Sequence, residues 1–360
     1  MSRKKLEKAL KEQQEEEAKK IFEFERNGQT HELTVDYSEC IGTPFEIRHI
    51  ESMAFFRDEY FVYSYDSGLW RSKDCSDWKK AAQVADHKSY KLTVANNLLF
   101  AHHYGNEFIF SEDGQIWNTV ELKQEISKIN NIFYFCGKWW ISADIYHRYS
   151  YKEKGLLWDS CKTSDYGTRT VFFESEKLDG EWKQSDALFL SDGQIIKAES
   201  LFVTDEIICA ICSYDYSYYN DKHLAENTKF IYADKYLRWY RADSSHEFIE
   251  WDGNPCAYID GEFTKNSAGI WCATAKGLFF SENGKSWLRK TEDSCYDDFV
   301  AVDGLLVARG WRGLYISNAG EEFKEFNPGF EANSIIFNGN SFIAYNSEKM
   351  FYGEFYVSPK

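Results

Sequence analysis

The segment SEDGQIW at residues 111–117 occurs again, nearly unchanged, as SENGKSW at residues 281–287. Both copies keep the order Ser, any residue, Asp or Asn, Gly, any two residues and Trp. Such a specific motif, written twice at a long interval, is typical of a repeat architecture in which every unit needs the same turn. We therefore expect partial copies elsewhere in the chain.

Partial copies do occur, and each follows a short strand-forming segment. They are SKDCSDW (72–78), SEKLDGEW (175–182), SNAGEEF (317–323) and, more distantly, YADKYLRW (232–239). Aromatic and β-branched residues precede the copies, as in FIF before Ser111. Further upstream stand two strands with a tight turn between them, as in DDFVAVDGLLVARG (297–310), where Asp303-Gly304 suits a hairpin.

The repeating unit is thus strand, turn, strand, loop, strand, heptapeptide turn and strand, which is the order of a four-stranded propeller blade. Six units end in an aromatic residue, and a seventh unit at 332–358 supplies three strands. We predict an all-β fold, a seven-bladed β-propeller, because a six-bladed ring accounts for fewer units. The fourth strand of the last blade is predicted to come from the N-terminal side, for instance from TPFEIRHI (43–50), which would close the ring and remove exposed sheet edges.

Residues 1–42 are predicted to form an extension that stands apart from a propeller spanning 43–360. Ser2 can cap a helix that runs to about Lys20. This helix carries few apolar residues, so it would face solvent or dock on a partner. The segment 21–37 then predicts a β-hairpin around Asn27-Gly28, either an accessory hairpin on the ring or an oligomerisation arm.

The heptapeptide resembles the Asp-box (BNR) repeat of sialidases and many other bacterial propellers. The resemblance covers residues 50–358 as a repeat pattern, and SEDGQIW alone matches every position. It implies a structural role, in which Ser and Asp side chains bind backbone N–H groups of the turn and the Trp packs into the blade. It also implies that these turns lie opposite the binding face. The residues given this role are Ser72, Asp74, Trp78, Ser111, Asp113, Gly114, Trp117, Asp179, Gly180, Trp182, Ser281, Asn283, Gly284 and Trp287.

The resemblance does not extend to the catalytic residues of sialidases. That chemistry requires an arginine cluster, a Tyr–Glu nucleophile pair and an acidic proton donor. The segment TPFEIRHIES (43–52) contains Arg48 but lacks the family's Phe-Arg-Ile-Pro-type motif. Since a fold alone does not imply a function, we predict no catalytic residue. A glycan-binding or sialidase-like hydrolytic propeller is the alternative hypothesis.

Charge and composition narrow the range of partners. The net charge of −16 is the reverse of a nucleic-acid-binding footprint, and no apolar stretch approaches the length of a membrane span. We predict a protein partner, with a basic one favoured by electrostatic complementarity. The nine cysteines show no framework spacing and the N-terminus shows no export signal, which predicts reduced thiols and a cytoplasmic protein.

No metal or other cofactor is predicted. Cys209-Ala-Ile-Cys212 is the one Cys-x-x-Cys sequence. In a strand, residues three apart point to opposite faces, so these sulfurs would not converge on a metal. His102 and His103 are adjacent and would diverge in the same way.

Two long segments interrupt the repeat in neighbouring blades, at 145–167 in the third and 213–228 in the fourth. We predict that both are loops between a second and a third strand, on one face of the ring. Insertions in compact repeats are often functional, and Tyr, Trp and Arg with small polar residues are typical of binding surfaces. We therefore predict a non-catalytic interaction module, an inhibitor, immunity-type or scaffold protein. Its predicted contact residues are Tyr146, Arg148, Tyr149, Trp158, Tyr166, Tyr214, Tyr216, Tyr218, Tyr219 and His223.

Overall fold

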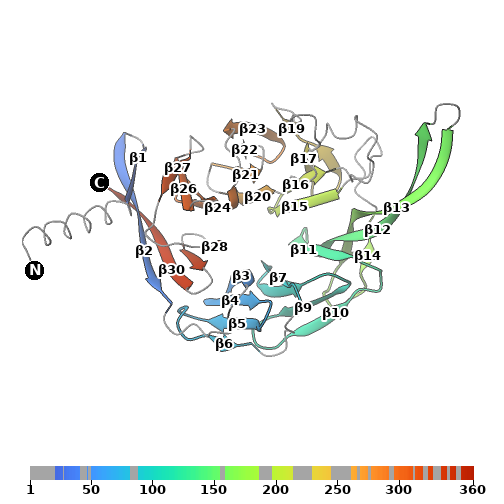
Figure 1. Cartoon of the computed structure of the whole chain (residues 1–360), viewed down its shortest axis with the longest axis horizontal. Helices are drawn as coiled ribbons and strands as arrows, with labels where there is room; N and C mark the ends of the chain where they lie inside the picture. The colour runs from blue at the N-terminus through green and yellow to red at the C-terminus, as the bar shows by residue number, and fades with distance from the viewer. Residues whose placement is uncertain are drawn as a thin grey trace, which may run out of the picture.

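Seven antiparallel sheets form a ring in the computed structural model, which is a seven-bladed β-propeller (Figure 1). The predicted fold class and blade number are therefore confirmed. No helix occurs in the part of the chain that the structure describes. The described part is residues 21–360 without 27, 41–46, 48–49, 82–87, 155–158, 186–196, 214–228, 245–260, 266–267, 275–276, 292–295, 311–312, 319–322, 327–333, 339–340 and 346–349. The predicted helix of residues 2–20 lies outside it.

Blades 1 to 4 each contain four strands in chain order from the centre outward. Blade 1 contains β3 (Ile50–Phe56), β4 (Glu59–Ser64), β5 (Gly68–Ser72) and β6 (Lys79–Lys80), and blade 2 contains β7 (Lys91–Ala95), β8 (Leu98–His102), β9 (Glu107–Ser111) and β10 (Asn118–Glu121). Blade 3 contains β11 (Lys128–Phe135), β12 (Lys138–Lys154), β13 (Asp159–Ser175) and β14 (Lys183–Gln184). Blade 4 contains β15 (Lys197–Val203), β16 (Ile208–Ser213), β17 (Lys229–Ala233) and β18 (Trp239–Arg241).

Blades 5 to 7 follow the same plan, and blades 5 and 7 each have a fifth strand at the outer edge. Blade 5 contains β20 (Gly261–Lys265), β21 (Ile270–Thr274), β22 (Gly277–Ser281) and β23 (Ser286–Thr291), and β19 (Asp243–Ser244) joins β23 in parallel. Blade 6 contains β24 (Tyr296–Val302), β25 (Leu305–Gly310), β26 (Gly313–Asn318) and β27 (Lys324–Phe326). Blade 7 contains β28 (Ser334–Asn338), β29 (Ser341–Tyr345), β30 (Met350–Pro359), β2 (Gln29–Glu39) and β1 (Ile21–Arg26).

The ring closes through β2, which pairs antiparallel with β30 from His31–Pro359 to Glu39–Phe351. The closing strand thus comes from the N-terminal side, as predicted, but from residues 29–39 and not from 43–50. The physical reason is that 43–50 contains Pro44, which cannot donate to a strand ladder. By contrast, β2 is long, and it buries Leu33 and Val35 on one face.

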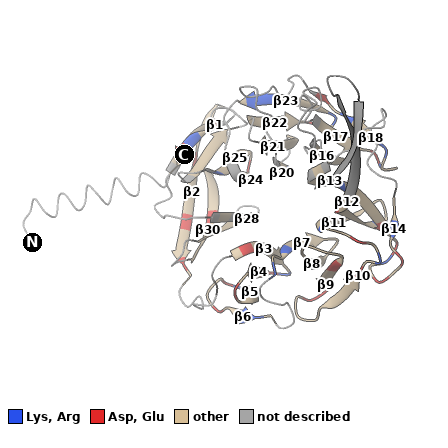
Figure 2. Ribbon diagram, turned by 45° about the vertical axis from the view of Figure 1, so that its right-hand side comes forward, with Lys and Arg blue, Asp and Glu red and all other residues tan. Residues whose placement is uncertain are grey.

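The predicted hairpin is confirmed, with Arg26 opposite Gln29 and Gly28 at φ +76° in the turn. It is part of the sheet of blade 7 and not a separate accessory (Figure 2).

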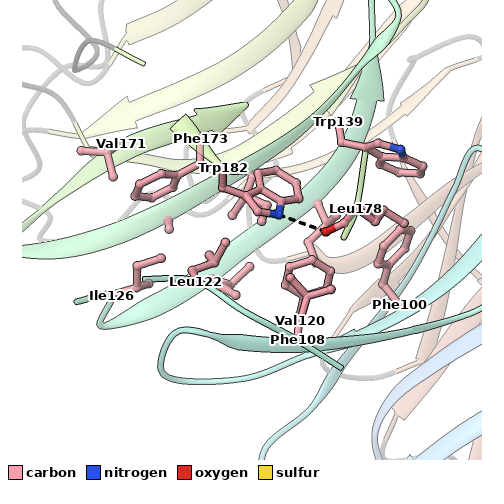
Figure 3. Packing of buried hydrophobic residues seen from close by; sticks show 14 residues of the cluster. Phe100, Phe108, Val120, Leu122, Ile126, Trp139, Val171, Phe173, Leu178 and Trp182 are labelled. Carbon is pink, nitrogen blue, oxygen red and sulfur yellow. Dashed lines mark hydrogen bonds between the residues drawn. The ribbon is translucent and has the colours of Figure 1, made fainter. Parts of the chain in front are cut away.

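The core is divided among the blade interfaces. Seven hydrophobic clusters are present, and each joins two neighbouring blades, including the last to the first. Figure 3 shows the one between blades 2 and 3, where Phe100 and Phe108 face Trp139 and Trp182. The pairs Phe100–Trp139 and Phe108–Trp182 pack edge to face, with ring centroids 5.4 Å and 6.0 Å apart. The aromatic content of 18% is therefore used mainly to hold neighbouring blades together.

The heptapeptide turns join the third and fourth strands of their blades. In blade 2, the Gly114 amide donates to Ser111 Oγ at 2.8 Å, and the amides of Gln115 and Ile116 donate to Asp113 Oδ1 at 2.8 Å each. These amides, that of Ile116 above all, lower the pKa of Asp113. In an Asx turn of this kind the side chain replaces missing backbone partners.

Other copies of the turn keep part of this pattern. In blade 1 the amides of Ser76 and Asp77 donate to Asp74 Oδ1 at 3.0 and 3.1 Å, and Ser72 Oγ donates to the same oxygen. In blade 5 the Gly284 amide donates to Ser281 Oγ at 2.8 Å and the Lys285 amide to Asn283 Oδ1 at 2.9 Å.

In blade 3 a backbone carbonyl accepts the hydrogen bonds of the turn in place of an acidic side chain. Ser175 Oγ donates to the Lys177 carbonyl at 2.7 Å, and the Gly180 amide donates to the same carbonyl at 3.0 Å. Asp179 is exposed.

The tryptophans that end the turns are buried. The indole Nε1 atoms of Trp78, Trp182 and Trp287 donate to the carbonyls of Cys75, Leu178 and Gly284 at 3.1 to 3.2 Å. Trp117 is equally buried, but its Nε1 has no partner among the described residues.

Candidate functional site

The two faces of the ring carry different connections. Because successive strands are antiparallel, the connections from second to third strand lie on the face where one blade leads into the next. The heptapeptide turns, from third to fourth strand, lie on the other. We call the first the arm face, which includes Tyr65–Ser67 of blade 1 and His103–Asn106 of blade 2.

On the arm face, blade 3 extends far beyond its neighbours. Strands β12 and β13 remain paired from Trp139–Ser175 to Lys154–Asp159, with a register shift between Arg148 and Ser150. The resulting two-stranded ribbon projects away from the ring (Figure 1). We call its outer part, Tyr146–Lys154 with Asp159–Thr168, the arm. The sequence predicted a loop here; the structure has strands, because alternating Tyr, Thr and polar residues favour a β-ribbon.

The structure places the predicted contact residues as follows. Tyr146 lies at the base of the arm opposite Thr168, with 67% of its surface exposed. Arg148 is paired with Tyr166, and Tyr149 lies at the register shift. Three of them thus belong to one stretch of β12. The remaining ones, Trp158, Tyr214, Tyr216, Tyr218, Tyr219 and His223, lie outside the described residues.

A buried carboxylate anchors the base of the arm. Asp144 is 6% exposed, and its Oδ1 accepts hydrogen bonds from Asn130 Nδ2 at 2.8 Å and Thr170 Oγ1 at 2.9 Å. The Ala198 amide of blade 4 donates to Thr170 Oγ1 at 3.0 Å. These bonds connect the three inner strands of blade 3 to blade 4, so they fix the direction in which the arm leaves the ring.

The adjacent histidines of blade 2 have different surroundings. His102 is 1% exposed, and its Nδ1 lies 3.0 Å from the Ile129 carbonyl of blade 3. Burial, with the positive charge of Lys91 nearby, lowers the pKa of His102 to about 3. His103 is half-buried against Tyr90, and burial and Lys88 lower its pKa as well. Both rings are therefore neutral at pH 7, and His102 serves to hold blade 2 to blade 3.

Exposed tyrosines lie at the arm face of the first three blades. Tyr65 and Tyr104 follow the second strands of blades 1 and 2, whereas Tyr146 lies within β12, the second strand of blade 3; their exposures are 38%, 63% and 67%. Lys128 Nζ lies 5.6 Å from the centre of the Tyr104 ring, which is a cation–π distance. Amphipathic rings of this kind are enriched in protein interfaces. The sequence signal that could have found them is a Tyr within a few residues of the buried part of a second strand.

The charges around these tyrosines have both signs. Lys88, Lys91 and Lys128 are exposed, and so is Glu51, which accepts a hydrogen bond from Ser89 Oγ at 3.1 Å. Mixed charges with aromatic rings suit recognition of a protein surface better than binding of one small ion.

A shallow groove of about 720 Å³ lies between blades 2 and 3, beside the heptapeptide turn of blade 3. Its floor is apolar, formed by Leu98, Phe110 and Trp139 among others, and its rim bears Glu112, Glu121, Glu176 and Asp179 with a single lysine, Lys177. This groove lies on the face opposite the arm.

The described residues offer little for other kinds of site. Within the described residues, no group of three or more His, Cys, Asp and Glu side chains converges as metal ligands would. Cys209 lies in β16 within the core, with its Sγ 3.8 Å from the Gly284 carbonyl. In the part of the chain that is described, no helix has the length and apolar character for a membrane span.

Known proteins resemble this chain in fold. No family model matches the sequence, and no curated protein does. Among solved structures, the AfRom2 CNH domain aligns with a TM-score of 0.54 at 9% identity over 89% of this chain and 98% of that domain. The extracellular domain of the putative hybrid two component system BT4673 from B. thetaiotaomicron aligns with a TM-score of 0.54 at 10% identity, over 92% of this chain and 46% of that one. BamB from Moraxella catarrhalis aligns with a TM-score of 0.49 at 10% identity, over 89% and 98%. At such identities the likeness concerns the fold alone.

Proposed function

We propose that this propeller is a non-catalytic protein-interaction module of the inhibitor, immunity or scaffold type, whose partner binds at the arm face of blades 3 and 4. The observation that carries the proposal is the arm itself. The backbone of the ribbon extends beyond the part of the strands that completes the sheet of blade 3, and long excursions from compact repeats are often functional. The hydrogen bonds at Asp144 support this, since they orient the arm from a rigid base.

The partner we infer is a protein with a basic surface. The net charge of −16 favours association with a cationic protein and speeds the encounter. Complex formation is therefore expected to weaken as salt increases.

We also infer that the heptapeptide turns belong to the Asp-box class, in which they are structural. The hydrogen bonds that Asp113 and Asp74 accept from turn amides support this assignment. It directs the search for a partner to the arm face.

Site-specific crosslinking tests the proposed function. A photo-reactive residue replaces Tyr146 in the intact chain, and crosslinked proteins from the native host are identified by mass spectrometry. The matched control carries the same residue at Tyr356, which is 47% exposed on β30. We expect one protein to be captured from position 146 and not from 356.

A variant with a shortened arm provides a second, independent test. Replacing residues 148–166 with Asn-Gly leaves His147 opposite Gly167, a register that a two-residue turn can join. The captured protein should lose binding to this variant, while the melting temperature stays unchanged. Equal capture from both positions, or full binding by the shortened variant, would contradict the proposal.

A further inference from the structure

The turn of blade 3 has a carboxylate that the turn itself does not use. SEKLDGEW (175–182) has one residue more than SEDGQIW (111–117). In blade 2 the Asp113 carboxylate accepts the turn amides, whereas in blade 3 the Lys177 carbonyl accepts the hydrogen bonds of the turn. The Asp179 side chain is exposed and has no hydrogen-bond or ion-pair partner among the described residues. Its charge is therefore available to a molecule outside the chain.

The groove between blades 2 and 3 brings four such carboxylates together. Glu112 and Glu121 come from blade 2, and Glu176 and Asp179 come from blade 3, so the negative charges stand on both sides of the hollow. All four side chains are exposed, and none pairs with another side chain in the part of the chain that the structure describes. Like charges held at one groove repel, and a bound cation relieves that repulsion. The rim therefore favours a positively charged ligand.

The floor of the groove offers apolar surface. Leu98 and Phe110 are only partly buried against the hydrophobic cluster between blades 2 and 3, and both line the groove. Trp139, which also lines it, lies at the margin of this cluster (Figure 3). Apolar surface in a hollow suits an apolar side chain, which loses contact with water when it binds there. A simple inorganic cation would make no use of this floor.

Two polar groups lie beside the apolar floor. Trp139 is only 6% exposed, yet its indole N–H donates to no described residue, whereas the neighbouring Trp140 donates to the Phe135 carbonyl at 3.1 Å. Asn118 also lines the groove, on the same face of β10 as the buried Val120, and its side-chain amide has no partner among the described residues. An indole N–H needs an acceptor, and a side-chain amide both donates and accepts. A peptide backbone supplies both kinds of group.

We propose that this groove binds a short basic peptide segment of a partner protein, in which one large apolar side chain is flanked by lysine or arginine residues. The apolar side chain rests on Leu98 and Phe110, and the flanking cations reach the carboxylates of the two blades. The peptide backbone meets Asn118 and Trp139. The groove volume of about 720 Å³ lies within the range of roughly 300–1,000 Å³ that is typical of ligand sites.

The peptide site is separate from the arm. It lies on the face of the heptapeptide turns, whereas the arm projects from the other face, so the two sites can be occupied together. The inference does not rest on the function proposed for the arm. A variant without the outer part of the arm should therefore bind the peptide as the wild type does.

Fluorescence polarisation with a labelled peptide tests the site on the full chain. The probe is Lys-Lys-Phe-Lys-Lys, and we expect saturable binding that weakens as salt increases. Two competitors separate the contributions of the floor and the rim. Lys-Lys-Ser-Lys-Lys should bind about tenfold more weakly, because it buries no aromatic ring. Spermine, which carries charge without an apolar side chain, should compete as weakly.

Matched double variants locate the site. Glu121→Gln with Glu176→Gln removes one carboxylate from each side of the groove and should lower the affinity about fivefold. Glu206→Gln with Glu325→Gln removes the same charge from exposed positions on blades 4 and 6, and it should leave the affinity unchanged. All four residues are exposed, so both variants are expected to fold.

Four results would overturn the proposal. They are the absence of binding by the probe at low salt, equal binding of the serine peptide or of spermine, an equal loss of affinity in the two double variants, and a loss of peptide binding in the variant with the shortened arm. The last result would transfer peptide binding to the arm face. Retained peptide binding in that variant, together with loss of the crosslinked partner, would support both sites independently.

Discussion

Gly114 lies directly against the ring of Phe61: a Cβ atom built on this glycine would be 2.3 Å from Phe61 Cζ. Gly114 belongs to the heptapeptide turn of blade 2, whereas Phe61 lies in β4 of blade 1. The turn therefore does more than reverse the chain, since its glycine is also the point where one blade rests on the preceding one. This double requirement explains why the motif keeps glycine in its best-preserved copies.

Replacing Gly114 with alanine should destabilise the protein by about 3 kcal/mol, because the left-handed backbone and the collision with Phe61 add together. Gly137→Ala is the matched control, since Gly137 has φ +82° and nothing within 4 Å of its built Cβ. That control should cost about 1 kcal/mol, for the backbone alone. Denaturant unfolding measures both, and equal losses would show that the contact with Phe61 is unimportant.

The acidic residues of two turns should differ in their effect on stability. Asp113 accepts two turn amides, so Asp113→Ala should lower the free energy of unfolding by about 1 kcal/mol. Asp179 stands in a turn that is held by Ser175 and the Lys177 carbonyl instead. Asp179→Ala is therefore expected to stay within about 0.5 kcal/mol of the wild type. Chemical unfolding measures the stability of both variants. A comparable loss of stability in the two would mean that Asp179 does support its turn.

The repeat could be predicted from the sequence because each blade is built from local signals. The turn at 111–117 and its relatives identify where third strands end, and these positions count the blades. The closing strand could not be located in this way, because its pairing joins residues 31–39 to residues 351–359, far apart in the chain. The strand that pairs with β30 is determined by packing between residues distant in the sequence. Leu33, for example, packs in the hydrophobic cluster between blades 6 and 7.

The candidate site was predicted only in part, for a related reason. An interruption of the repeat drew attention to Tyr146 and its neighbours, but composition alone does not distinguish a Tyr-rich loop from a Tyr-rich ribbon. The hydrogen bonds at Asp144 were missed because Asn130 and Thr170 come from flanking strands, and the strand register decides which side chains meet. An isolated acidic residue within the buried strand WWISADI was the available signal.

Removing the carboxylate of Asp144 should destabilise the base of the arm. In Asp144→Ala the half-buried donor of Asn130 and the buried donor of Thr170 lose their acceptor, at a cost of about 2–3 kcal/mol. Asp144→Asn keeps one oxygen acceptor, so it should retain most of that stability. Hydrogen exchange of the amides in β12 and β13 will show whether the loss is concentrated there. Unchanged protection in Asp144→Ala would mean that the arm is held by other contacts.

The buried imidazole of His102 should make stability depend on pH between about 3 and 6.5. Its pKa is lowered to about 3 in the folded protein, while an unfolded histidine titrates near 6.5. The unfolded chain thus binds more protons in this range, so stability is complete above pH 6.5 and falls as the pH decreases, by up to about 1.4 kcal/mol per pH unit. His102→Asn offers a neutral amide in place of the imidazole and should remove this part of the pH dependence. The measurement is chemical unfolding at pH 4.5, 5.5, 6.5 and 8, and parallel curves for variant and wild type would contradict a buried neutral His102.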